Sequence, residues 1–424
     1  MEKIINLLKK YDDISDYRII KNDVDSYELF FVHESLETVR ATSTSSLEVT
    51  LYVDFKSYRG NSTFSINNAD DEESINAKIV NAINMAKLIT NKKFKLPKDE
   101  VLDETLKSNF SDYEPKVLGA KMFNILKECS SKVKGQLNAT EIFIYKTTTH
   151  LINSKGIDKK CIKYSSMIET IPTYDTKNDS VEIYTQLNFT SFDEKWLKEQ
   201  ISQALKDVTA RSKAKKLDHD INVNVILRPQ EIEQIIRAYV NELNYMTIYN
   251  KFNILNVNDD IQQNSQGDKL NVSILGQIEN CSSSRLFDND GITLKKKVLI
   301  KGGVLVNTYG SNTYAQYLHK KPTGDLNLIS LGKGKKSPKE LKENPYLECA
   351  SFSGLQVDLM NDYIGGEVRL AYYFDGQKTT PVTSLSISGK LSEVIKNIVL
   401  SNKITTVDSY KGPSLALLTG MKIF

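Results

Sequence analysis

The sequence has few of the residues that build disulfide frameworks and metal clusters. Its 424 residues include only four cysteines and four histidines. The cysteines lie far apart and form no Cys-x-x-Cys pair, at Cys129, Cys161, Cys281 and Cys349. Neither a structural zinc site nor a dense set of disulfides is therefore indicated. We interpret the cysteines as buried free thiols in a reducing compartment.

Long hydrophobic runs and a charge excess are also missing. No stretch approaches 18 apolar residues, and the first ten residues read as an amphipathic helix rather than a signal peptide. A net charge of +3 is almost balanced for this length, whereas a general nucleic-acid binder usually has a strong basic excess. The sequence thus predicts a soluble, cytoplasmic protein that binds neither membranes nor nucleic acid.

What remains is the composition of an ordinary globular protein, 40% hydrophobic and 26% charged, long enough for two or three domains. Residues 1–215 indicate two similar passes of helix, strands and helix, which we assign to subdomains 1–100 and 101–215. Period-two alternation and apolar runs predict strands; they cover 27–33, 38–42, 47–53, 58–66, 141–146, 162–171 and 181–189. Apolar stripes at helical spacing predict helices from residue 75, from Pro115 and around Leu197–Val208.

A basic linker, 210–218, leads to a third region, 216–424, that is mostly strand. Helices are predicted only at 230–245 and 390–400. The run 331–338 is rich in glycine and lysine and reads as a mobile surface loop, because it lacks the spacing of a phosphate-binding loop. The strands are expected at 221–227, 270–275, 298–306, 367–374, 382–387 and 415–423.

Several phrases of the C-terminal half resemble the TldD/PmbA family, whose members are also named modulators of DNA gyrase. Residues 287–291 and 298–305 resemble the family's "FDSEG … IIKDGIL", and 387–398 resembles "IAGNLLDMLKNI". Similar phrases stand at 309–318, 365–376 and 412–421, and weaker similarity reaches forward to "NSKG" at 153–156. The motif positions, which we expect to be structural, are Asn153, Gly156, Asp288, Gly291, Gly302, Gly365, Gly366, Gly376, Gly389, Asn397, Gly412 and Ser414.

The resemblance implies an α+β fold with an N-terminal α/β region of antiparallel sheets and a β-rich, barrel-like C-terminal domain with few helices. It also implies dimers that enclose a cavity. Catalytic members of the family carry a helix with His-Glu-x-x-x-His and a distant cysteine, which together bind zinc. Three such ligands leave a fourth position for the water that the metal activates.

The corresponding helix here is expected at 230–245, and the motif window falls on Arg237–Glu242. Neither histidine is present, and no cysteine follows Cys349. The resemblance therefore implies no catalytic residue, no metal and no cofactor. The degenerate positions are expected to face the cavity; they are Arg237, Ala238, Asn241 and Glu242. Arg237→Ala, at an exposed polar helix position, is expected to cost less than about 0.5 kcal/mol.

The leading hypothesis is thus a PmbA/TldE-like, non-catalytic subunit of a zinc metalloprotease that processes small or unfolded peptides. It would pair with a TldD-like catalytic subunit, or with itself. One alternative is a hydrolase with an unrecognised site, since a Ser–His–Asp triad can meet only in the fold. The other is a protein that binds and modulates DNA gyrase. Whether the chain alone is an enzyme stays open.

Overall fold

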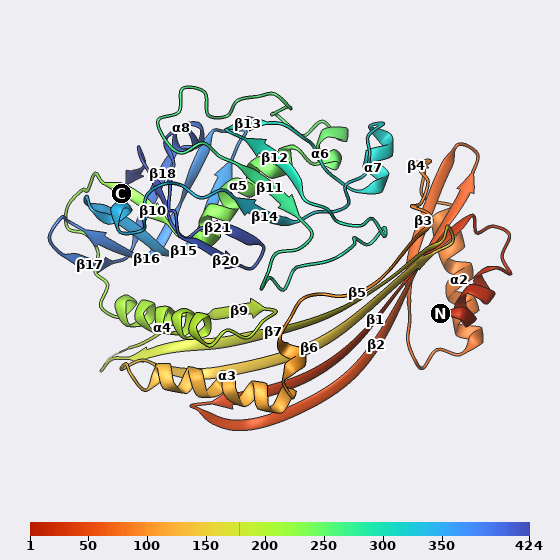
Figure 1. Cartoon of the computed structure of the whole chain (residues 1–424), viewed down its shortest axis with the longest axis horizontal. Helices are drawn as coiled ribbons and strands as arrows, with labels where there is room; N and C mark the ends of the chain where they lie inside the picture. The colour runs from red at the N-terminus through yellow and green to blue at the C-terminus, as the bar shows by residue number, and fades with distance from the viewer. Residues whose placement is uncertain (178) are drawn as a thin grey trace.

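The computed structural model describes residues 1–177 and 179–424, and Figure 1 shows a strongly curved sheet of long strands with a C-terminal domain above its concave side. The N-terminal sheet has the order β4-β3-β2-β1-β6-β7-β5, with β8 and β9 paired to β7. Its strands are β1 (Asp16–Val32), β2 (Ser35–Phe55), β3 (Tyr58–Ile66), β4 (Asn91–Lys92), β5 (Glu100–Thr105), β6 (Gln136–Asn153), β7 (Ile157–Asp175), β8 (Ser180–Glu182) and β9 (Thr185–Phe189).

The strands of this sheet are much longer than the sequence pattern predicts. The expected strands 38–42 and 47–53 are one strand, β2, and β1 begins eleven residues before residue 27, at Asp16. In the middle of β1, from Lys21 to Asp25, no residue is fully buried. The period-two signal that comes from one buried face is therefore lost there, although the backbone stays extended.

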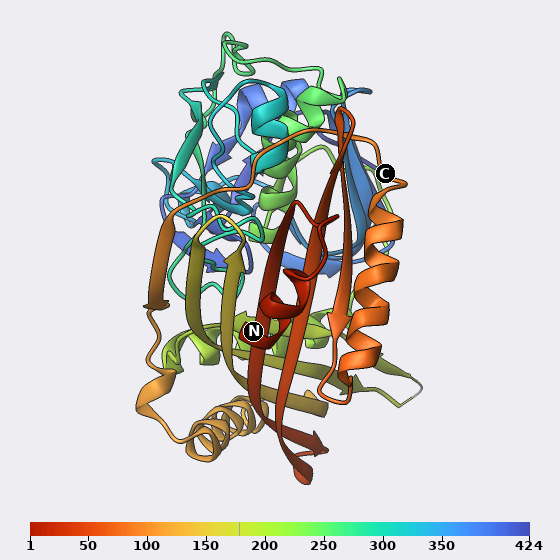
Figure 2. The same ribbon diagram turned by 90° about the vertical axis from the view of Figure 1, so that its right-hand side faces the viewer.

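Helices cover one face of the N-terminal sheet at its two ends and leave the middle open. They are α1 (Glu2–Leu8), α2 (Glu72–Ala86), α3 (Pro115–Ser130) and α4 (Glu194–Arg211), with a 3-10 turn η1 at Phe110–Asp112. Ile19 of β1 lies in the core with α1 and α2, and Leu29 of the same strand lies in the core with α3 and α4. Both are odd-numbered, so the two pairs of helices share one face. Figure 1 shows α2 at one end of the long strands and α3 and α4 at the other, and Figure 2 shows the same sheet turned by 90°.

The C-terminal domain contains two more sheets. A half-barrel has the order β19-β22-β10-β15-β16-β18-β23, with β17 paired to β16, and a small sheet has the order β13-β12-β11-β14-β21-β20. The half-barrel strands are β10 (Asn224–Leu227), β15 (Tyr346–Asp358), β16 (Tyr363–Phe374), β17 (Thr379–Val382), β18 (Leu385–Lys390), β19 (Val399–Leu400), β22 (Ala416–Leu418) and β23 (Lys422–Ile423). The small sheet consists of β11 (Val272–Leu275), β12 (Lys297–Lys301), β13 (Val304–Leu305), β14 (Leu328–Leu331), β20 (Ile404–Val407) and β21 (Tyr410–Pro413).

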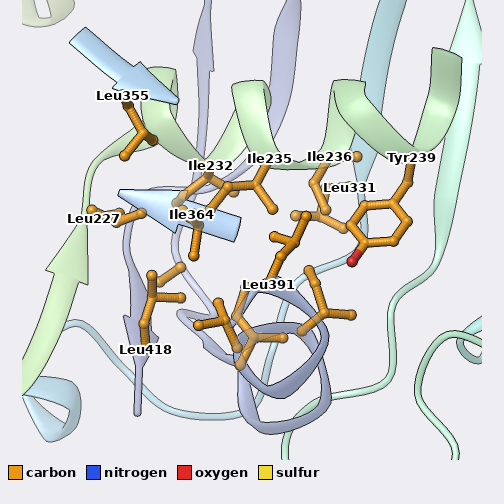
Figure 3. Packing of buried hydrophobic residues seen from close by; sticks show 14 of the residues in the cluster. Leu227, Ile232, Ile235, Ile236, Tyr239, Leu331, Leu355, Ile364, Leu391 and Leu418 are labelled. Carbon is orange, nitrogen blue, oxygen red and sulfur yellow. The ribbon is translucent and has the colours of Figure 1, made fainter. Parts of the chain in front are cut away.

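One hydrophobic core joins both of these sheets to α5. Ile232, Ile235 and Ile236 of that helix are fully buried against Leu227, Leu331, Ile364, Leu391 and Leu418 (Figure 3). The helices of this domain are α5 (Pro229–Glu242), α6 (Tyr245–Tyr249), α7 (Asn312–Tyr317) and α8 (Leu391–Asn397), with a 3-10 turn η2 at Glu340–Lys342. The expected α+β class with a barrel-like C-terminal domain is confirmed.

Three local expectations for the C-terminal domain are wrong. The helix expected at 390–400 ends at Asn397, because the next residues pair with β22 as β19. The strand β15 was not predicted, although it is the partner of β16 over its whole length. The run 331–338 keeps its lysines exposed at the surface, but its backbone is packed: Gly334 is buried, its N–H donates to the Ser401 carbonyl at 3.2 Å, and a Cβ there would meet the Leu400 carbonyl.

The C-terminal domain packs on the face of the N-terminal sheet opposite the helices. Ile20 and Leu151 share a small apolar core with Leu286 and Phe287. Beside it, the fully buried Lys159 ammonium donates to Thr293 at 2.6 Å and pairs with Glu100, and Arg18 pairs with Asp290 at 2.9 Å. Over the described residues, none of the helices is long and apolar enough to cross a membrane.

Candidate functional site

The helix α5 stands where the family resemblance places the zinc helix, directly after β10. Arg228 precedes it in an extended conformation, and Pro229 opens its first turn, where a missing N–H is harmless. The helix is shorter than the expected 230–245. It ends at Glu242, and Asn244 then starts α6 by accepting a hydrogen bond from the Met246 N–H at 2.8 Å.

The Arg237 guanidinium is held on one side of α5 by three neighbours. It pairs with Glu233 one turn earlier, donates to the Asn327 carbonyl at 2.8 Å and donates to the Ser409 hydroxyl at 3.2 Å. The Ser409 hydroxyl in turn donates to Glu233 at 3.1 Å. The side chain is only 29% exposed. The expectation of a freely exposed Arg237 is therefore wrong, because it links α5 to two distant segments of the small sheet.

Burial also shifts the pKa values of two side chains in this part of the domain, Tyr410 and Cys281. Burial, and then the Glu233 carboxylate, raise the pKa of Tyr410, whose hydroxyl donates to the Pro413 carbonyl. Burial likewise raises the pKa of Cys281, whose thiol donates to the Asp408 carbonyl. A protonated thiol is a poor nucleophile and a poor metal ligand. The side-chain oxygen of Asn327 is buried and accepts no hydrogen bond from the described residues.

The other degenerate positions face different surroundings. Glu242 is buried, not exposed as expected, because its carboxylate accepts the Ile254 and Leu255 N–H groups at 2.6 and 3.0 Å. Asn241 is exposed and Ala238 is half-buried. Arg237 and Glu242, the positions of the two family histidines, thus contact separate parts of the chain.

These residues do not fit a zinc ion. A guanidinium held in place repels a second cation, and Glu242 is engaged by backbone N–H groups elsewhere. Within residues 1–177 and 179–424, no three His, Cys, Asp or Glu side chains are grouped to hold a metal. His150 and His219 contact aspartates, Asp158 and Asp218, at the surface, and neither contacts a serine in the hydrogen bonds of the described residues.

A second charged network, which the sequence did not reveal, fixes α5 to the N-terminal region. Arg228 pairs with Asp207 of α4 at 2.6 Å and with Glu348 of β15 at 3.1 Å, and Tyr372 donates to Asp207 at 2.7 Å. Burial alone would lower the pKa of Arg228, but the two carboxylates hold it above its usual value. Only the pairing of strand and helix brings these residues together, so no local pattern could have indicated them.

Glu231, in the first turn of α5, has no ion-pair partner among the residues that the structure describes. Burial raises the pKa of its carboxyl to about 7, although Arg228 opposes the shift. The neighbouring Cys349 is fully buried, and burial together with Glu231 raises the pKa of its thiol. This half of the helix therefore carries an acid that titrates near neutral pH.

The family motif positions build turns where the two parts of the chain meet. Asn153 accepts the Lys155 and Ile157 N–H groups at the β6–β7 turn. Asp288 accepts the N–H groups of Asp290, Ile292 and Asp325 at 2.9 to 3.0 Å. Gly291, at φ +87°, lies so close to Ile157 that a Cβ would stand 2.9 Å from it. The other positions lie at turns, close backbone contacts and capping sites: Gly156, Gly302, Gly365, Gly366, Gly376, Gly389, Asn397, Gly412 and Ser414.

Fold and helix together define the class: a two-part α+β protein of the kind seen in three solved structures. One is TldE from Thermococcus kodakarensis, at TM-score 0.82 and 15% identity, covering 100% of this chain and 99% of that one. The others are described as modulators of DNA gyrase, from Thermotoga maritima (0.80, 12%, 100% and 99%) and Bacteroides thetaiotaomicron (0.78, 15%, 100% and 97%). At such identities these likenesses show the fold.

Comparison of the sequence with protein-family models identifies a family. Residues 221–423 match the model of the PmbA/TldA metallopeptidase C-terminal domain. The curated proteins contain no match to this chain. Residues 221–423 therefore form a C-terminal domain of the PmbA/TldA family, as the motifs in that half of the chain indicated.

Proposed function

We propose that this chain is a TldE-like, non-catalytic subunit that pairs with a zinc-bearing TldD-like chain and helps to hold peptides for that partner's active site. The observation that carries the proposal is the Arg237 network. The helix keeps its place after β10, yet its motif position is occupied by a cation tied to Glu233, Ser409 and the Asn327 carbonyl. A catalytic metal has no room for its ligands there.

Peptide holding is supported by an outer strand beside this network. The strand β20 is the outer strand of the small sheet and pairs only with β21 within the described residues. Added strands bind through backbone hydrogen bonds and demand little of the peptide's sequence.

The test uses the full chain and a TldD-like chain with the His-Glu-x-x-x-His motif from the same genome. Alone, this chain should hydrolyse no casein-derived peptide, and light scattering should show a homodimer. Mixing should give a heterodimer whose peptide hydrolysis stops when a chelator removes zinc. A strict monomer that forms no complex, or hydrolysis by the chain alone, would contradict the proposal.

The two rival functions predict different results in the same samples. A hydrolase with an unrecognised site would cleave peptides alone and resist chelators. A gyrase modulator that acts through DNA would bind DNA with an affinity that falls steeply as salt rises. The net charge of +3 favours neither a basic stripe nor such a salt dependence.

A further inference from the structure

A cavity opens on the helix-bearing face of the N-terminal sheet, beside the first turn of α3, where Pro115 and Leu118 line it. Its volume is about 620 Å³. Aromatic rings line its interior, including the buried Phe110 and the half-buried Tyr27 and Tyr113. Asp25 and Lys146 also line it and are exposed, so they lie at its mouth. Aromatic walls with a few convergent polar groups are the usual form of a small-molecule site.

The strand register places the charged groups in one row across four neighbouring strands. Ser43 of β2 stands opposite Asp25 of β1, Asp25 opposite Lys146 of β6, and Lys146 opposite Tyr164 of β7. Directly opposed residues on neighbouring strands have Cβ atoms about 5 Å apart. A negative and a positive group are therefore fixed side by side on the helix-bearing face.

These two charges do not satisfy each other. The Ser43 hydroxyl donates to Asp25 at 2.8 Å, but no ion pair joins Asp25 to Lys146 anywhere in the described structure, where Lys146 also makes no side-chain hydrogen bond. Two residues further along the same face, Lys21 and Asp23 do pair, at 2.8 Å. Two opposite, adjacent charges that form no ion pair with each other, above aromatic rings, match a ligand that carries both charges and an apolar group.

We propose that this cavity binds a zwitterionic amino compound, either a free amino acid or a dipeptide, with an aromatic side chain. The ligand's ammonium group lies at Asp25 and its carboxylate at Lys146. Its side chain enters the aromatic interior at Phe110, Tyr27 and Tyr113. The inference is independent of the proposed subunit function, because the cavity lies on the helix-bearing face, opposite the C-terminal domain.

Calorimetric titration of the purified chain tests the proposal with L-phenylalanine, the dipeptide Phe-Ala and the doubly blocked N-acetyl-phenylalaninamide. We expect L-phenylalanine or Phe-Ala to bind with a dissociation constant of about 1 mM or tighter. The tighter of the two identifies the source of the ligand. The blocked compound should bind at least about tenfold more weakly, since both charge-assisted bonds are lost. No binding of either zwitterion at about 10 mM, or equal binding of the blocked compound, overturns the proposal.

Three variants show whether the named charges do the binding. Asp25→Asn and Lys146→Met should each weaken the binding of the preferred zwitterion about tenfold or more. Asp23→Asn, on the same strand and face but outside the cavity, should leave it unchanged. Circular dichroism and the thermal midpoint confirm that each variant is folded. If Asp25→Asn and Lys146→Met bind as the unsubstituted chain does, the assignment of the two charges is wrong.

Discussion

Charged side chains are arranged in opposite ways around α5 and in the middle of the N-terminal sheet. Around α5, Arg237 and Arg228 are each enclosed by carboxylates and other acceptors that come from distant segments. In the sheet, Asp25 and Lys146 stand side by side without pairing. Burying an unpaired charge costs free energy, so buried charges are paired. Exposed charges are solvated by water and remain available to bind a ligand. The comparison therefore separates charges that hold the fold together from charges that are free to bind.

The largest effect should follow from breaking the Arg228 network. Arg228→Met leaves the buried Asp207 carboxylate without its cation, whereas Glu348 keeps its ion pair with Lys342. Removing one partner of a buried pair typically costs about 3–5 kcal/mol. Urea denaturation should show a loss of that size. Arg369→Met, which removes an exposed arginine from β16, is the matched control and should change stability by less than about 0.5 kcal/mol; equal losses in both variants would contradict the network's role.

A smaller loss should follow from truncating Arg237. Arg237→Ala takes away the partner of Glu233 and the donor of the Asn327 carbonyl, so it should cost about 1–3 kcal/mol. This exceeds what the sequence pattern alone predicts for an exposed helix position. The same urea titration measures it. A loss below about 0.5 kcal/mol would mean that the network adds nothing to stability.

The pH dependence of stability tests the unpaired acid of α5, Glu231, against the paired charges of the same helix. The pKa of Glu231 is raised to about 7 in the folded chain from an ordinary value of 4.5. Folding therefore favours the neutral acid, and its stabilising effect is complete below pH 4.5 and is lost as the pH rises to about 7. Glu231→Gln stays neutral at every pH. Relative to the unsubstituted chain, this variant should gain about 1–3 kcal/mol between pH 4.5 and pH 8; a difference that does not change with pH would refute the shift.

The smallest effect on stability is expected at the sheet row. Asp25→Asn keeps the hydrogen bond from Ser43 and breaks no ion pair in the described structure. Exposed positions of this kind usually change stability by less than about 0.5 kcal/mol. Denaturation of this variant beside Arg228→Met gives the contrast directly. A loss above about 2 kcal/mol would show that Asp25 supports the fold, and the distinction drawn between the two regions would fail.

The sequence could predict α5 but not the contacts of its polar residues. The spacing of Ile232, Ile235, Ile236 and Tyr239 produces an apolar stripe that any helical burial requires. Two partners of Arg237 lie 90 and 172 residues away in the sequence. Sequence patterns within a helix cannot predict such distant contacts. Glu242 looked like a surface residue because its two backbone donors come from the loop after α6.

The N-terminal sheet shows the same limit in another form. Parts of its strands were predicted, such as 47–53 of β2, where apolar residues are buried under helices. The middle of β1 and β2 carries polar residues on both faces, so alternation vanishes although the strands continue. The row that joins Asp25, Lys146 and Tyr164 exists only through the pairing of β1, β6 and β7. The turn residues Asp288 and Gly291 were found because the family phrases mark them.

The most direct test of the account is the zinc content of the purified chain and of one variant. After dialysis against buffer with trace zinc, elemental analysis should find far less than one zinc per chain. The triple variant Arg237→His, Ala238→Glu and Glu242→His should not gain tight zinc either, because positions 237 and 242 contact separate segments and the orienting groups are absent. About one zinc bound per unsubstituted chain would contradict the proposed non-catalytic subunit.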